Sequence, residues 1–178
     1  MSRTLYAVVC GAGPAAQVGR LITYAQGRGW SVQILATSAA VEHFLDLGSL
    51  EQITGRPVRT GYRTAGGPSS LTQADAVVVA PATYNTVNKW AAGISDTYVL
   101  SILAELTGLR LPVAALPFVN TALAANPVFG RSVSSLREAG VNVLFGPGGF
   151  EPHPPRTGAE GVERFPWHVA VDAVTRPQ

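Results

Sequence analysis

The 178-residue sequence has one cysteine, Cys10, and one methionine, at its first position. A single cysteine excludes an intrachain disulfide and a metal site built from several thiolates. Charge is also scarce, because charged residues make up 13% of the chain against 47% hydrophobic residues. This balance argues against intrinsic disorder and favours a large buried core. It also favours a homo-oligomer whose subunits cover one another's uncharged surfaces.

Long apolar runs are missing as well, so no segment has the length of a membrane-spanning helix, and residues 1–4 lack the apolar core of a signal peptide. Thirteen basic and eleven acidic residues give a net charge of +2 without a cluster of arginines or lysines. We therefore expect a soluble cytoplasmic protein that binds neither membranes nor nucleic acid.

Short apolar runs alternate with helical patterns along the whole chain. Such alternation predicts right-handed crossovers in a three-layer α/β domain, Rossmann-like or flavodoxin-like, with a mostly parallel sheet of about six strands. Ser95-Asp96 and Asn126-Pro127 are the expected starts of two helices. We expect strands at residues 5–10, 32–36, 76–80, 112–116 and 141–145, with at most one more around Val58.

The chain shows no internal repeat and no interdomain linker, so residues 1–178 are expected to form a single domain. Glycine and proline are frequent at residues 146–165, where we expect a loop or a substrate lid. A terminal helix is expected at residues 167–174.

The first two strands end in residues suited to an anion. Glycines in Gly11-Ala12-Gly13-Pro14 let backbone N–H groups approach a phosphate, although a plain strand-to-helix turn explains them equally well. The spacing is not that of a dinucleotide site, because Ala16 replaces the third glycine and no acidic residue ends the second strand. Thr37 and Ser38 stand there instead, as neutral donors to a phosphate or as a simple helix cap.

The third strand end is the most specific. Residues 76–80 are followed by Pro81-Ala82-Thr83-Tyr84-Asn85-Thr86 and then by Gly93-Ile94-Ser95-Asp96; Leu116-Pro117-Phe118-Val119-Asn120 follows the next strand. These segments resemble the homo-oligomeric flavin-containing cysteine decarboxylases, the family of phosphopantothenoylcysteine decarboxylase and of the lantibiotic peptidyl-cysteine decarboxylases. The corresponding family signatures are Pro-Ala-Ser-Ala-Asn-Thr, Gly-Ile-x-Asp and Pro-Ala-Met-Asn. The resemblance runs over residues 4–147.

The resemblance implies an FMN cofactor, a small-molecule or peptide substrate, and a trimer or a dodecamer of trimers. It places Asn120 on the substrate carboxylate, whereas the residue type alone fits a loop cap equally. It also assigns ten residues to the cofactor. These are Gly11, Ala12, Gly13, Thr37 and Ser38 at the phosphate and ribityl chain, Thr83, Tyr84, Asn85 and Thr86 along the ring, and Phe118 on the opposite side.

Two catalytic features of the family are missing from the sequence. Its histidine belongs to a His-Ile-x-Leu stretch that corresponds here to Pro68-Ser69-Ser70-Leu71, and its late-loop cysteine has no counterpart. His153 and Arg156, in the late loop, are candidate replacements, although a solvated loop histidine is the simpler interpretation of His153.

Three hypotheses follow. The first is an FMN-dependent decarboxylase-type enzyme that oxidises a cysteine-derived or related small or peptidyl substrate. The second is a non-catalytic flavin-binding protein with a regulatory or assembly role. The third, a relative of the flavin prenyltransferases, shares the fold and the early glycine turn but differs in the motif at residues 81–86.

Overall fold

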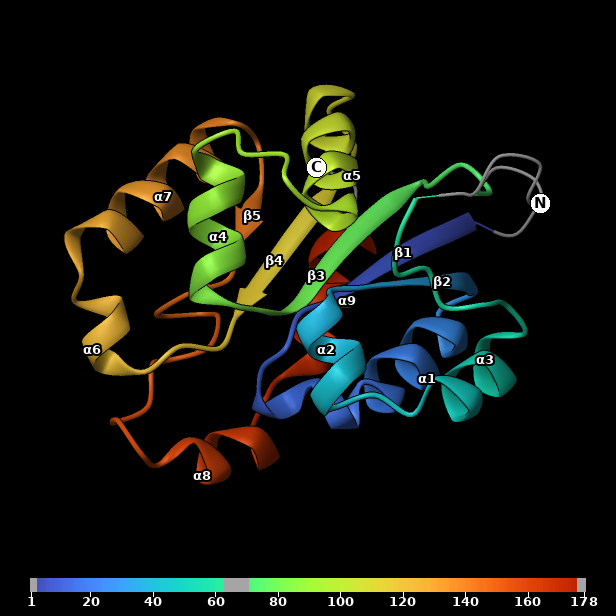
Figure 1. Cartoon of the computed structure of the whole chain (residues 1–178), viewed down its shortest axis with the longest axis horizontal. Coiled ribbons are helices and arrows are strands. Elements are labelled where there is room, and N and C mark those ends of the chain that lie inside the picture. Colours follow the sequence, from blue (N-terminus) through green and yellow to red (C-terminus); the bar gives the residue numbers. More distant parts are fainter. Residues whose placement is uncertain (1–2, 63–70, 176–178) are drawn as a thin grey trace.

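A five-stranded parallel sheet forms the centre of the computed structural model, which describes residues 3–62 and 71–175 (Figure 1). The spatial order is β2-β1-β3-β4-β5, and each neighbouring pair is parallel. The α/β fold predicted from the sequence is therefore confirmed. The strands are β1 Arg3–Val9, β2 Trp30–Ala36, β3 Ala76–Ala82, β4 Val113–Pro117 and β5 Asn142–Val143.

The strands are continuous apolar runs because helices cover both faces of the sheet. In β1, Leu5 and Ala7 belong to the hydrophobic core on one face, and Tyr6 and Val8 to the core on the other. Figure 1 shows the two outer layers. One contains α1 Gly19–Gly27, α3 Leu47–Thr54 and α9 Trp167–Thr175; the other contains α4 Tyr84–Ala91, α5 Tyr98–Gly108 and α7 Pro127–Glu138.

Shorter helices follow the carboxyl ends of the strands. They are the 3-10 helix η1 Gly13–Gln17 after β1, α2 Ser38–His43 after β2 and α6 Thr121–Ala124 after β4. Within residues 3–62 and 71–175, no helix combines the length and the apolar character needed to cross a bilayer. The same residues contain no group of three or more histidine, cysteine, aspartate or glutamate side chains placed to hold a metal ion.

The sheet has five strands where about six were expected. Around Val58 the chain forms a single parallel bridge, in which the N–H of Arg59 donates to Ile34 and its carbonyl accepts from Ala36, each at 2.9 Å. Pro57, just before this bridge, has no N–H to donate to a neighbouring strand. The pairing therefore does not extend into a sixth strand.

Two expected helix starts differ in outcome. Asn126 caps α7 as predicted, because its side chain accepts from the N–H of Val128 at 3.1 Å and Pro127 is the first helical residue. The predicted cap of α5 at Ser95-Asp96 is wrong. Thr97 caps α5 by accepting from the N–H of Leu100.

The segment at residues 146–165 contains a short helix, α8 Gly158–Glu163, between irregular stretches. An aromatic cluster joins this segment to the end of β4. The ring of Phe118 lies 5.3 Å from that of Phe150 and 5.8 Å from that of Phe165. A Cβ on Gly161 would lie 3.1 Å from the Phe118 ring, so α8 packs closely on it. The segment is thus docked beside the sheet.

Candidate functional site

A cleft of about 540 Å³ lies at the carboxyl edge of the sheet, beyond the end of β1 and between α2, α4 and the start of α5. The strand order reverses between β1 and β3, and ligands of open α/β sheets bind at this switch point. Flavodoxin, with the same strand order, is a known example. The lining residues are Gly11, Ala12, Ala36, Thr37, Ser38, Ala39, Thr60, Thr83, Tyr84, Asn85, Thr86, Lys89, Thr97, Tyr98, Val99, Leu100, Phe118 and Leu123.

Nine of the ten residues predicted to contact the cofactor line this one cleft, although they come from four separate strand ends. The exception is Gly13. A Cβ there would lie 2.9 Å from Val162, so Gly13 packs against α8 and outside the lining. The structure brings the remaining nine together, and their contacts to a cofactor stay a prediction.

The α2 side of the cleft is built by close backbone packing. Gly11 approaches α2 so tightly that a Cβ would lie 2.8 Å from the Ala39 Cβ and 2.9 Å from the Ala39 carbonyl carbon. Thr37 caps α2 by accepting from the N–H of Ala40 at 3.3 Å. The first N–H groups of a helix have no intrahelical acceptor, so those of Ser38 and Ala39 are left for a ligand. The α2 side therefore presents hydroxyl and backbone N–H donors to an anion.

The α4 side is held by a local network. The Thr83 hydroxyl accepts from the N–H of Thr86 at 3.2 Å and donates to the Thr86 hydroxyl at 3.0 Å, as a helix cap. The Tyr84 ring stacks on Phe129, which is fully buried, with ring centroids 5.7 Å apart. Asn85 is exposed, and its amide forms no hydrogen bond within residues 3–62 and 71–175. This amide is therefore available to a ligand.

Cys10 lies beneath the α4 side and is fully buried. Burial raises the pKa of its thiol, and the neighbouring Thr86 and Thr83 hydrogen bonds oppose this only in part. A thiol with a raised pKa stays protonated at neutral pH and is a poor nucleophile. Cys10 therefore acts as a small core residue.

Lys89, Thr97 and Tyr98 are lining residues that the sequence analysis missed. Lys89 follows Asn85 by one helical turn, a spacing that places both on one face of α4 and could have revealed it. Its ammonium group lies 2.5 Å from the carboxylate of Asp96. Thr97 and Tyr98 lie in the cleft lining at the start of α5, where Thr97, and not Ser95 or Asp96, is the helix cap.

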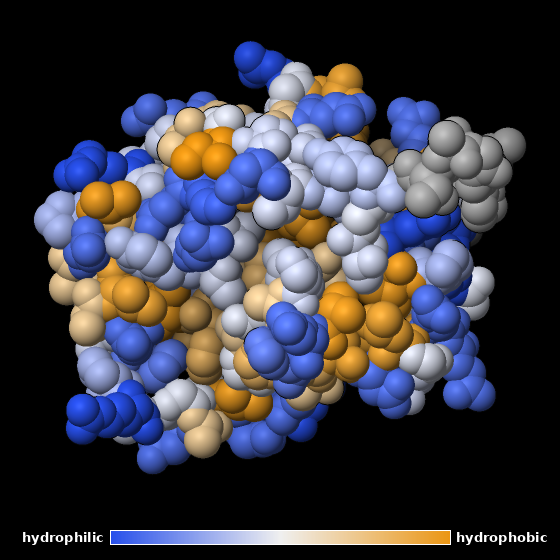
Figure 2. Space-filling model, viewed as in Figure 1, coloured by the Kyte–Doolittle hydropathy of each residue, from blue (hydrophilic) through white to orange (hydrophobic). Residues whose placement is uncertain are grey.

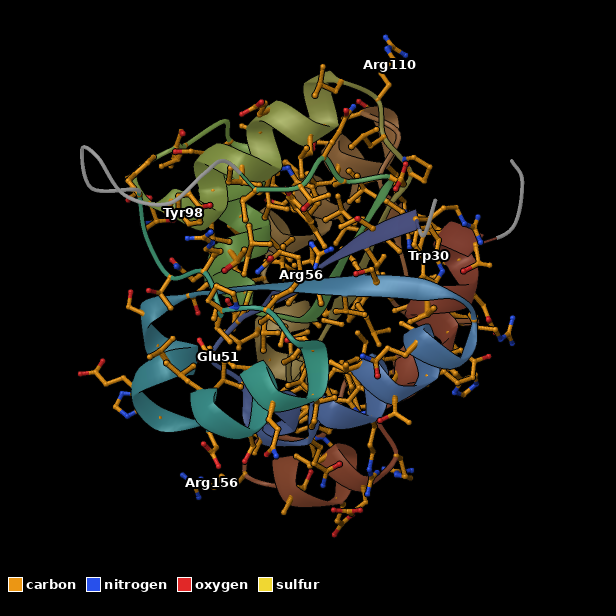
Figure 3. All side chains as sticks on the ribbon, turned by 90° about the vertical axis from the view of Figure 1, so that its right-hand side faces the viewer. Trp30, Glu51, Arg56, Tyr98, Arg110 and Arg156 are labelled. Atoms are coloured by element: carbon orange, nitrogen blue, oxygen red, sulfur yellow. The ribbon has the colours of Figure 1, made fainter. Side chains whose placement is uncertain are left out.

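The three candidate catalytic residues lie outside the lining of this cleft. The side chain of Asn120 caps α6, accepting from the N–H of Leu123 at 2.9 Å, which is the loop-cap alternative. His153 stacks on Phe118 with ring centroids 4.6 Å apart, and its backbone forms a bridge with Asn120. Arg156 is exposed, and Figure 3 shows it beside α8, far from Tyr98 at the start of α5.

The environment of His153 is apolar. Its Nδ1 is buried without a hydrogen-bond partner in the part of the chain that the structure describes. Burial lowers the pKa of the imidazole, so the neutral form is favoured at pH 7. The histidine predicted as a solvated loop residue or a catalytic group is thus half-buried against Phe118. Of the segment that replaces the family histidine, residues 68–70 lie outside the described residues.

The chain is similar to several known proteins. A family model described as Flavoprotein matches residues 2–160. A coenzyme A biosynthesis bifunctional protein CoaBC of Mycolicibacterium smegmatis is 34% identical over 120 residues, which cover 65% of this chain and 28% of that protein. A probable phosphopantothenoylcysteine decarboxylase of Streptococcus mutans is 29% identical over 118 residues, 63% of this chain and 65% of that protein. The chain thus matches less than two thirds of the length of either relative.

Solved structures show the same fold at low sequence identity. The FMN-dependent cysteine decarboxylase SpaF superposes with a TM-score of 0.72 at 22% identity, covering 99% of this chain and 98% of SpaF. The cypemycin decarboxylase CypD gives a TM-score of 0.73 at 22% identity, covering 97% and 92%. At this identity the likeness establishes a common fold.

Proposed function

The chain belongs to the flavoprotein family, and from this premise we propose that it binds FMN in the cleft at the β1/β3 switch point. The observation that carries the proposal is the convergence of nine predicted cofactor residues on one cleft. Its volume of about 540 Å³ lies within the range of small-ligand sites, roughly 300–1,000 Å³.

The residues of the cleft fit the parts of FMN. Ser38, Ala39 and the Gly11 turn offer amide and hydroxyl donors to the phosphate. Tyr84, fixed by its stack on Phe129, and the exposed amide of Asn85 form a side suited to a flat ring with polar edges. A flavin ring placed between α4 and Phe118 would also be shielded by Val99 and Leu100.

We propose further that the protein is an FMN-dependent decarboxylase-type enzyme for a cysteine-derived or related small or peptidyl substrate. Bound FMN supplies a two-electron acceptor for oxidation of the substrate thiol, after which loss of carbon dioxide becomes possible. The cleft orients the substrate against the ring and excludes water through Phe118 and Leu123. SpaF and CypD are decarboxylases of this fold.

One observation favours the second candidate, a non-catalytic flavin-binding protein. Among the described residues that line the cleft there is no histidine, cysteine, aspartate or glutamate, so no side chain there ordinarily titrates near neutrality. His153 stacks on Phe118 and lies outside the cleft lining, and the Asn120 side chain is engaged as a cap. This candidate keeps the cofactor and dispenses with turnover.

Two measurements test these proposals. Titration of the purified protein with FMN, followed by flavin fluorescence, tests the cofactor; Asn85→Ala should weaken binding, whereas Val128→Ala, an exposed residue outside the cleft lining, should not. Colourless protein that takes up no FMN would refute both candidates. Anaerobic mixing with cysteine-terminated peptides or phosphopantothenoylcysteine then distinguishes the two candidates. The decarboxylase-type enzyme should release carbon dioxide and bleach the flavin, and the non-catalytic protein should do neither.

We also propose that the protein is a homo-oligomer, as its composition predicts. Figure 2 shows hydrophobic residues in several separate patches on one face. A second cavity, of about 720 Å³, lies along α5 and is bordered by Tyr62 and Leu109, which are 67% and 62% exposed. A second copy over this surface would remove both from water. Light scattering should then give more than one chain per particle and a smaller value for Leu109→Glu; a monomer at micromolar concentration would contradict the proposal.

A further inference from the structure

Lys89 is the only lysine among the 13 basic residues of the sequence. It is also the only charged side chain among the described residues that line the cleft. The other lining groups are apolar side chains, hydroxyls and one amide. An anionic ligand in this cleft would therefore meet one full positive charge. This charge belongs to α4, whereas Thr37 and Ser38 lie across the cleft at the start of α2.

The charge of Lys89 is balanced by Asp96 at the edge of the cleft. The two groups lie 2.5 Å apart, and their side chains are 31% and 50% exposed. Asp96 itself does not line the cleft. The N–H of Ile94 donates to the carbonyl of Lys89 at 2.9 Å and fixes the turn between them. An ion pair this exposed contributes little to folding stability, so its existence alone does not account for a lysine at the ligand surface.

Oxidation of a thiol in this cleft would place a negative charge near Lys89. Conversion of a CH₂–SH group to CH=S releases two electrons and two protons. A flavin ring bound in the cleft would take up two electrons and one of these protons and would so gain one negative charge, and the second proton would pass to solvent. A fixed cation close to developing charge stabilises it strongly in a site shielded from water.

We propose that Lys89 stabilises the negative charge that the flavin ring gains on reduction, and that Asp96 limits this effect by neutralising part of the Lys89 charge. This inference rests on the proposed binding of FMN in the cleft. The ring is expected along residues 83–86, and Lys89 lies one turn further on the same helix face as Asn85. Lys89 would thereby set how readily the bound flavin accepts electrons.

The alternative is that the Lys89–Asp96 pair only ties α4 to the segment before α5. The two interpretations predict different changes in the reduction potential of the bound flavin for substitutions at Lys89 and Asp96. A structural tie is lost equally in Lys89→Gln and Asp96→Asn, so both variants would weaken oxidised and reduced flavin alike. An electrostatic role makes the two variants move the reduction potential in opposite directions, because one removes a positive charge and the other a negative charge.

The experiment measures FMN affinity and the midpoint potential of the bound flavin in the full chain and in three variants. Lys89→Gln should weaken binding of reduced FMN about tenfold more than that of oxidised FMN, as expected for loss of a nearby opposite charge, which lowers the midpoint potential by about 30 mV. Asp96→Asn should raise the potential, and Lys89→Arg should stay close to the unmodified protein. Equal potentials in Lys89→Gln and the unmodified protein, or shifts of the same sign in the Lys89→Gln and Asp96→Asn variants, would overturn the inference.

A separate readout locates the charge without any turnover. Because the chain has one lysine, reductive methylation followed by mass spectrometry of proteolytic peptides reports on the Lys89 side chain separately from the α-amino group, the other amine that reacts. Bound FMN should slow this methylation, and an unchanged rate would place the ring away from Lys89. Failure of the unmodified protein to bind FMN would refute the proposed function itself, whereas normal FMN binding with an unchanged potential in Lys89→Gln would refute this inference only.

Discussion

Replacing Gly11 by alanine tests whether the close contact between the β1 turn and α2 builds the cleft. The added Cβ would lie 2.8 Å from the Ala39 Cβ and 2.9 Å from its carbonyl carbon, and ordinary contact begins at 3.4 Å. The backbone around Ala39 must therefore retreat by about 0.6 Å, the difference between 3.4 and 2.8 Å. No rotation of a side chain can relieve a contact with a backbone carbon.

Two losses follow from this displacement. Overpacking of this kind costs about 1–3 kcal/mol of folding stability. The N–H groups of Ser38 and Ala39 move with the first turn of α2, so FMN should lose at least part of one hydrogen bond to its charged phosphate, worth about 1.5–3 kcal/mol. We expect a lower urea midpoint, and FMN binding weakened by roughly tenfold or more, in a fluorescence titration.

Gly19→Ala is the matched control, because no atom lies within 4 Å of a Cβ built there. Gly19 begins α1, where alanine is the better helix former by up to about 1 kcal/mol, so this variant should be as stable as the unmodified protein or more so. Unchanged stability and FMN affinity in Gly11→Ala would refute the packing argument. Reduced stability with normal FMN affinity would place the phosphate elsewhere.

Three further predictions concern stability and pH. Phe129→Ala should lower the free energy of unfolding in urea by about 3–5 kcal/mol, because Phe129 is fully buried against Tyr84 and Phe145. Val128→Ala, at an exposed position, should change that free energy little. Equal effects of the two substitutions would contradict this. Burial raises the pKa of Tyr6 to about 12, so the native state holds the phenol proton more tightly than the unfolded chain, in which the pKa is near 10. Folding stability should therefore fall between pH 10 and 12. Tyr6→Phe should flatten that fall, and an unchanged pH profile of stability would refute the assignment. Burial lowers the pKa of His153, so the folding stability that this residue contributes is present above its unfolded pKa of about 6.5 and is lost as the pH falls through the lower folded pKa. His153→Phe keeps a ring against Phe118 and should reduce the loss of stability on acidification. An identical loss of stability in the variant and the unmodified protein would contradict this.

Much of the fold follows from local patterns in the sequence. Residues 76–80 predict a strand because a strand covered on both faces must be apolar throughout, and β3 Ala76–Ala82 contains this run. Thr37 and Asn126 could be recognised as helix caps because a cap depends on residues two or three positions away. Parallel pairing then brings the residues at successive strand ends to one edge, which explains why nine predicted residues meet in the cleft.

The remaining features depend on contacts between distant segments. Phe118 belongs to a motif that predicts part of the flavin site. Its ring also anchors residues 146–165 by contacts with Phe150, His153 and Phe165. His153, stacked on Phe118 in this docked segment, lies outside the cleft lining.

The sequence by itself determined that this chain is a parallel α/β protein and which residues follow its strand ends, because periodicity and capping are local properties. Only the tertiary structure decided that Gly13 faces Val162, that Asn120 serves as a cap and that Lys89 is the single charge lining the cleft among the described residues. These outcomes depend on how elements pack after the crossovers have formed, and no short stretch of sequence encodes that packing.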